Sequence, residues 1–100
     1  MEQYFEWDDK KAEMNFRKHG VPFKLATQAF EDPFALVEQE RIENGEQRWQ
    51  TIGATRDGLL LLLVAHTVRL EEDDGVDVEI VRIISARRAD RKERRRYEHR

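Results

Sequence analysis

The chain has 100 residues, of which 39% are hydrophobic and 39% are charged. This length suits a single domain spanning residues 1–100, with enough apolar residues for one core and little expected disorder. Cysteine is absent, which excludes disulfides, thiolate nucleophiles and cysteine zinc sites, and the three histidines lack the spacing of metal ligands. We therefore expect no metal and no other cofactor.

The net charge of −3 hides a strong asymmetry along the chain. Residues 1–81 contain 9 Lys or Arg against 18 Asp or Glu, whereas residues 82–100 contain 9 against 3. The basic end can attract phosphate groups although the whole chain is acidic. The start lacks the pattern of a secretory signal, and the apolar run at 59–65 is too short to cross a bilayer. We expect a cytoplasmic protein without membrane contact.

Two helices are predicted near the N-terminus. The first covers residues 9–19, with Asp8 as its N-cap and Gly20 as the glycine that ends it. The second starts at Pro22, which the first turn of a helix tolerates, and ends near Glu31. Apolar residues at helical spacing give each helix one side to bury.

The hydrophobic pattern then becomes alternating, which predicts four strands in an antiparallel meander. The first begins at residue 34, and the others cover residues 48–54, 59–69 and 76–84. Asn44-Gly45 and Asp57-Gly58 mark turns, and residues 67–76 are expected to form a long acidic connection. Asp90 and Glu93 form a capping box that predicts a short helix over 91–99. The expected fold class is α+β, with two N-terminal helices, a four-stranded antiparallel sheet and a short C-terminal helix.

Three segments, in chain order, resemble the BrnT family of toxins. FEWDDKKAEMNFRKHGVPF at 5–23 is similar to the family's opening, GEQRWQTIG at 45–53 to its central segment, and RIISARRADRKERRRYE at 82–98 to its ending. The resemblance implies a RelE-like fold and an endoribonuclease that cleaves RNA without a metal and inhibits translation. It also implies a BrnA-like ribbon-helix-helix antitoxin, which neutralises the toxin and provides the only contact with operator DNA.

Metal-free RNA cleavage lets the ribose 2′-hydroxyl attack the adjacent phosphorus, which requires a proton acceptor, a proton donor and cations near the developing charge. Arg82, Arg87 and Arg88, at the end of the last strand and just beyond it, are expected to converge on one phosphate. A solvated basic rim that only tethers RNA is the alternative. His19 lies in a matched motif and can move protons near neutral pH, but a structural role at a helix end explains it equally well.

Tyr97, with Arg94 one turn before it, can stack on a base or move a proton, as RelE-like toxins imply, or can anchor the last helix. The catalytic candidates are therefore His19, Arg82, Arg87 and Tyr97. The candidates for binding RNA or its phosphates are Lys11, Asn15, Lys18, Arg48, Arg88 and Arg94. A non-catalytic module that binds nucleic acid or protein through the C-terminal arginines is the alternative function.

Overall fold

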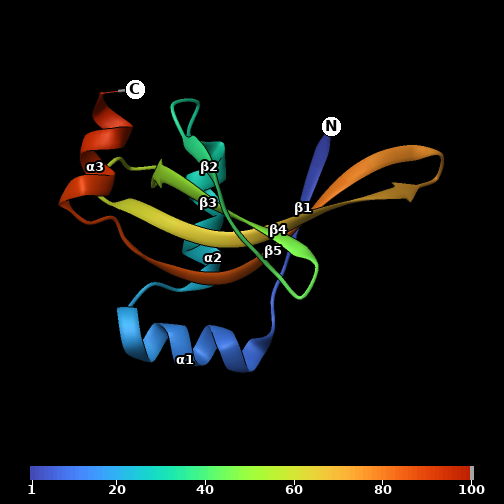
Figure 1. The fold of residues 1–100 in the computed structure, drawn as a ribbon, viewed down its shortest axis with the longest axis horizontal. Coiled ribbons are helices and arrows are strands. Elements are labelled where there is room, and N and C mark those ends of the chain that lie inside the picture. Colours follow the sequence, from blue (N-terminus) through green and yellow to red (C-terminus); the bar gives the residue numbers. More distant parts are fainter. Residues whose placement is uncertain (100) are drawn as a thin grey trace.

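The computed structural model describes residues 1–99, which form three α-helices, one 3₁₀ helix and five strands. In chain order the elements are β1 (Glu2–Glu6), α1 (Asp9–His19), α2 (Phe23–Ala26), the 3₁₀ helix η1 (Thr27–Glu31), β2 (Leu36–Glu43), β3 (Glu46–Ala54), β4 (Leu61–Asp73), β5 (Val76–Arg88) and α3 (Arg91–Glu98). All strands belong to one sheet in the order β1-β5-β4-β3-β2. Figure 1 shows α1 on one side of this sheet and α3 at its other side.

The sheet is mixed, because β1 runs parallel to β5 while every other neighbouring pair is antiparallel. The prediction of four antiparallel strands was therefore wrong at the N-terminus. β1 is held by its ladder to β5 and by Phe5, whose ring lies 5.1 Å from that of Phe30. Five residues are too few for a clear alternating pattern, so the strand gave only a weak signal in the sequence.

The first predicted helix is confirmed at both ends. Asp8 accepts a hydrogen bond from the Lys11 backbone N–H, and Gly20 has a φ of 71° and donates to the Phe16 carbonyl. The prediction of one continuous second helix was wrong, since α2 has four residues and continues as η1. At this junction the Thr27 hydroxyl donates to the Lys24 carbonyl, a local bond that competes with regular helical pairing.

β4 and β5 are the longest elements, with 13 residues each, and form a hairpin that projects from the body of the molecule (Figure 1). The expected long acidic connection over 67–76 was wrong. Its residues continue the ladder as far as Asp73 and Val76, and only Asp74-Gly75 turn, both with positive φ. An Asp-Gly pair suits a two-residue turn of this kind, so the acidic residues can extend the two strands into solvent.

Two apolar clusters lie on opposite sides of the sheet. The larger one joins α1, α2 and η1 to the sheet through buried residues that include Phe23, Ala26 and Val81. The smaller one contains Ile52, Leu61 and Leu63, with the Tyr97 ring of α3 packed against it. None of the helices in residues 1–99 is both long and apolar enough to span a membrane.

Candidate functional site

The two faces of the sheet carry different side chains. The helix face, against which α1, α2 and η1 pack, includes Leu62, Val64, Val81 and Ile83. Because side chains alternate along a strand and paired residues share a face, the registers place four arginines on the other face. We call this side the open face; α3 covers only one end of it, and its arginines are Arg48, Arg69, Arg82 and Arg87.

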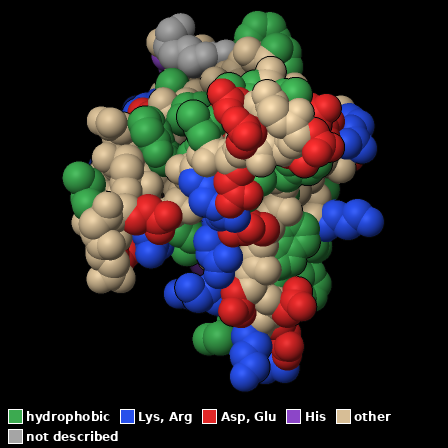
Figure 2. Space-filling view, turned by 90° about the vertical axis from the view of Figure 1, so that its right-hand side faces the viewer, with side chains coloured by type: hydrophobic (Ala, Val, Ile, Leu, Met, Phe, Trp, Pro, Cys, Tyr) green, Lys and Arg blue, Asp and Glu red, His purple; other side chains and the backbone are tan. Residues whose placement is uncertain are grey.

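Arg82 and Arg69 meet at one carboxylate that β1 supplies. Glu6 lies opposite Arg82 in the parallel ladder, and its oxygens are 3.2 Å from Arg82 Nη1 and 2.7 Å from Arg69 Nη1. The hydrogen bonds from Arg69, and then from Arg82, lower the pKa of Glu6 to about 2. Figure 2, which views the end from which the hairpin projects, shows acidic and basic side chains lying side by side. Glu71 also lies 2.8 Å from Arg69 Nε, so at neutral pH this cluster holds two cations and two anions.

Arg87 is paired at the other end of the open face. Its Nη1 and Nη2 each lie 2.8 Å from a carboxylate oxygen of Glu93, and Nη1 also donates to the Arg88 carbonyl. Glu93 also accepts the Asp90 backbone N–H, so the predicted capping box of α3 is confirmed. Burial opposes ionisation of Glu93, but the Arg87 hydrogen bonds prevail and lower its pKa.

The predicted convergence of three arginines on one phosphate was wrong. β5 continues through Arg88, so Arg87 and Arg88 are consecutive strand residues with side chains on opposite faces. Arg82 and Arg87 share the open face, but their partners on β4 are four residues apart, a separation of about 13 Å. This spacing suits two phosphates of one RNA strand better than a single phosphate.

The candidates on α1 lie behind the sheet as seen from the open face. Lys11 and Lys18 are exposed there and His19 is half-buried, and all three belong to the helix that packs on the face opposite Arg82. Asn15 is 7% exposed and bonds to the backbone of β5, donating to the Ala86 carbonyl over 2.8 Å and accepting the Ala86 N–H over 3.1 Å. Its amide therefore ties α1 to the sheet.

Tyr97 anchors α3. Its hydroxyl donates to Asp32, and the same carboxylate oxygen accepts the Ala54 backbone N–H. Its ring packs on the smaller apolar cluster. Arg94, one turn earlier, is exposed. Of the two readings that the sequence allowed for Tyr97, these contacts support the anchor.

Arg48 lies on the open face beside β4 and is largely covered, with its side chain 21% exposed. Its Nη2 lies 3.2 Å from Glu43, whereas its buried Nε has no hydrogen-bond partner among the described residues. The side chains of Arg69, Arg82 and Arg87 are more accessible, at 44%, 41% and 37% exposed. Among the four arginines that the strands place on the open face, these three are the most accessible to an RNA backbone.

The sequence analysis did not predict the roles of three residues in this arrangement: Glu6, Arg69, and Glu93 as the partner of Arg87. Glu6 requires β1, for which Phe5 and Trp7 at alternate positions were the available signal. Arg69 sits in a predicted strand, but its meeting with Glu6 depends on contacts between residues 63 positions apart. No local pattern encodes such a pair.

Comparison with known proteins adds a separate line of evidence. Residues 7–93 match the model of the family described as "Ribonuclease toxin, BrnT, of type II toxin-antitoxin system". No curated protein matches the chain. The matched region includes both arginine groups of the open face and most of the structure that supports them.

Proposed function

Since the chain belongs to the BrnT family of ribonuclease toxins from type II toxin-antitoxin systems, we propose that it cleaves RNA on the open face without a metal ion. The observation that supports this proposal is the set of accessible arginines on the open face of the sheet. Arg82 and Arg69 bind the phosphate at which the bond breaks, and Arg87 binds a neighbouring phosphate. Cleavage of messenger RNA then inhibits translation in the cytoplasm.

The chemistry follows from what the guanidiniums can do. The 2′-oxygen gives its proton to water and bonds to phosphorus, the P–O5′ bond breaks, and the 5′-oxygen leaves with a proton from water. In between, extra negative charge lies on the phosphorus oxygens, and fixed cations stabilise that charge more than they stabilise the starting phosphate. Arg69 and Arg82 are held in place by Glu6 before RNA arrives, so little ordering remains to be done. An incoming phosphate replaces Glu6 as the partner of at least one guanidinium, because both ligands accept the same donors.

The proposed partner is an antitoxin of the BrnA-like ribbon-helix-helix type. It would neutralise the toxin by covering the open face and would contact operator DNA itself. The arginines of the open face suit a partner that presents carboxylates there.

Two substitutions in β5 test the site against a matched control. Arg82→Ala should reduce cleavage of a purified messenger RNA by at least roughly tenfold, because one donor to the transition state is lost. Arg88→Ala removes an arginine from the same strand but from the helix face, and should leave cleavage nearly unchanged. Urea unfolding of both variants separates loss of activity from loss of fold. All reactions contain EDTA, since the proposed mechanism needs no metal.

Equal cleavage by the wild type and Arg82→Ala would remove Arg82 from the mechanism. Cleavage by the wild type that occurs without EDTA but not in the reactions that contain it would refute the metal-free step.

A non-catalytic RNA-binding module is the second candidate. It is favoured by one observation: each accessible arginine of the open face already has a carboxylate partner. Such pairs can exchange for phosphates and bind RNA without a free general base. RNA that binds in a salt-dependent manner but stays intact during prolonged incubation with the folded protein would establish this alternative.

A further inference from the structure

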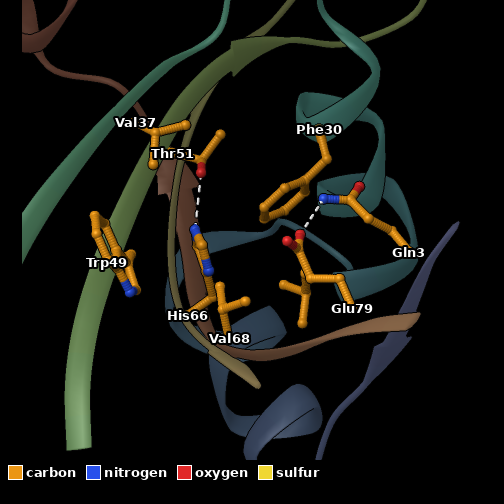
Figure 3. A pocket seen from close by; sticks show the side chains of 9 residues that line it. Gln3, Phe30, Val37, Trp49, Thr51, His66, Val68 and Glu79 are labelled. Atoms are coloured by element: carbon orange, nitrogen blue, oxygen red, sulfur yellow. Dashed lines mark hydrogen bonds between the residues drawn. The ribbon is translucent and has the colours of Figure 1, made fainter. Parts of the chain in front are cut away.

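A pocket of about 480 Å³ lies on the helix face, away from the arginines of the open face. Its lining comes from η1 and all five strands: Gln3, Phe30, Val37, Trp49, Thr51, His66, Val68, Glu79 and Val81. Figure 3 shows Glu79 and Gln3 at one side of this pocket, with Thr51, Val37 and Trp49 at the other. Its volume lies in the range of sites that hold one or two side chains or a small ligand.

Most of the lining is apolar and part of it is open to solvent. Val37 is 55% exposed on the edge strand β2, and the Trp49 ring lies nearby on β3. Phe30 forms the wall on the η1 side, where its ring meets that of His66 at 4.9 Å. An aliphatic stem or an apolar side chain would therefore be buried by entering the pocket.

One end of the pocket is anionic. Glu79 carries the only formal charge among the nine lining residues, and its carboxylate accepts a hydrogen bond from the neutral amide of Gln3 over 2.6 Å. The β4–β5 register places Glu72 and Asp77 on the same face of the hairpin just beyond Glu79. This end of the helix face thus carries three carboxylates and attracts cations.

His66 does not offset this charge. It is 2% exposed, its Nε2 lies 2.8 Å from the Thr51 hydroxyl, and its Nδ1 has no hydrogen-bond partner in the described chain. Burial lowers the pKa of His66 to about 4, so the ring is neutral at physiological pH. An RNA phosphate would meet only negative charge here, whereas the open face offers it cations.

We propose that this pocket binds an extended segment of a protein partner that carries an arginine or lysine beside Glu79 and an apolar residue over Val37 and Trp49. The basic side chain lays its stem on Val68 and places its cation next to the Glu79 carboxylate. The aliphatic stem of the basic side chain can pack against the aromatic rings of the pocket wall. The site lies on the face opposite the proposed RNA site, so a partner can occupy it whether or not the open face cleaves RNA.

Short blocked peptides test the proposal by NMR on the whole protein. The probe is acetyl-Leu-Ala-Arg-Ala-Leu-amide, compared with the same peptide carrying Gln or Glu in place of Arg. We expect the arginine peptide to shift the Trp49 indole N–H and the methyl groups of Val37 and Val68. It should bind roughly three- to tenfold more tightly than the glutamine peptide, as one partly screened charge pair allows. The glutamate peptide should bind more weakly still.

Glu79→Gln should abolish the difference between the arginine and glutamine peptides. Glu98→Gln removes an exposed carboxylate from α3 and should preserve that difference. Equal binding of the three peptides, or no shift at the pocket with any of them, would overturn the proposal. Adenosine monophosphate that shifts the Trp49 signal more strongly than the arginine peptide would instead show a nucleotide site. RNA cleavage measured on the same samples reports separately on the open face.

Discussion

Asn15 illustrates what a single side chain reveals only in three dimensions. In the sequence it belongs to a polar stripe on the first helix and was expected to face RNA. In the structure its amide bonds to the carbonyl oxygens of Val21 and Ala86 and to the Ala86 N–H. The Ala86 partner lies 71 residues away in the chain, so spacing within the helix cannot distinguish a substrate contact from a buried brace.

Asn15→Ala should therefore act on stability. It leaves three backbone groups without their partner, two of them on the buried Ala86, at a cost of roughly 1–3 kcal/mol in the free energy of unfolding. Urea denaturation measures this change. Lys18→Ala, on the same helix but exposed, is the control and should stay within about 0.5 kcal/mol of the wild type. A fully stable Asn15→Ala protein with impaired RNA binding would instead support a direct contact between Asn15 and RNA.

Secondary-structure elements whose sequence signals lie within a few residues agree with their predictions. α1 with its caps, the Asn44-Gly45 turn and the capping box of α3 each depend on partners within about four positions. The predictions that were wrong concern features that depend on residues distant in the sequence or on the neighbouring strands. β1 needs β5, and the polar pair Arg87-Arg88 resembled the start of a loop although it continues a strand.

α3 depends on one carboxylate that serves two partners. Glu93 completes the helix cap at Asp90 and receives both terminal nitrogens of Arg87. Glu93→Gln should lower the free energy of unfolding by roughly 1–3 kcal/mol, because a neutral amide cannot satisfy the half-covered guanidinium. Hydrogen exchange should show faster exchange in α3 than in β4. Glu98→Gln, at the end of the same helix, should alter neither measurement, and unchanged protection of α3 in Glu93→Gln would contradict this account.

For the whole molecule, charge is divided between surfaces in a way that the net charge of −3 conceals. The open face carries Arg69, Arg82 and Arg87, each paired with a carboxylate, whereas the tip of the projecting hairpin carries mainly carboxylates. The sequence revealed the asymmetry along the chain. The division between the faces of one sheet required the register of the strands, including the irregularity between Ala65 and His66.

Acid should destabilise the molecule in two stages. Burial holds the pKa of His66 at about 4 against an ordinary 6.5, so the unfolded chain takes up the proton first. The contribution of neutral His66 to the free energy of unfolding is fully present above pH 6.5. It is lost, by on the order of 3 kcal/mol, as the pH drops towards 4. Glu6, with a pKa of about 2 against 4.5, stabilises fully above pH 4.5 and loses that contribution as the pH falls towards 2.

Urea titrations between pH 7 and pH 2 measure both stages. Glu6→Gln should remove part of the second stage, worth less than about 1 kcal/mol because solvent screens this pair, and should leave the first unchanged. His19→Ala should retain the first stage, which excludes His19 as its source. A stability that does not change between pH 6.5 and 4 would show that His66 titrates normally in the fold.

The parallel pairing of β1 with β5 also determines when the open face can assemble during synthesis. The strand that supplies Glu6 is synthesised well before its neighbour β5, and the α3 residue that binds Arg87 follows β5. Pairings between such distant segments form late and slowly. Glu6 therefore has no Arg82 to pair with until β5 is made, and Arg87 lacks Glu93 until α3 follows, so the arginines of the open face acquire their ordered arrangement only after α3 has been synthesised.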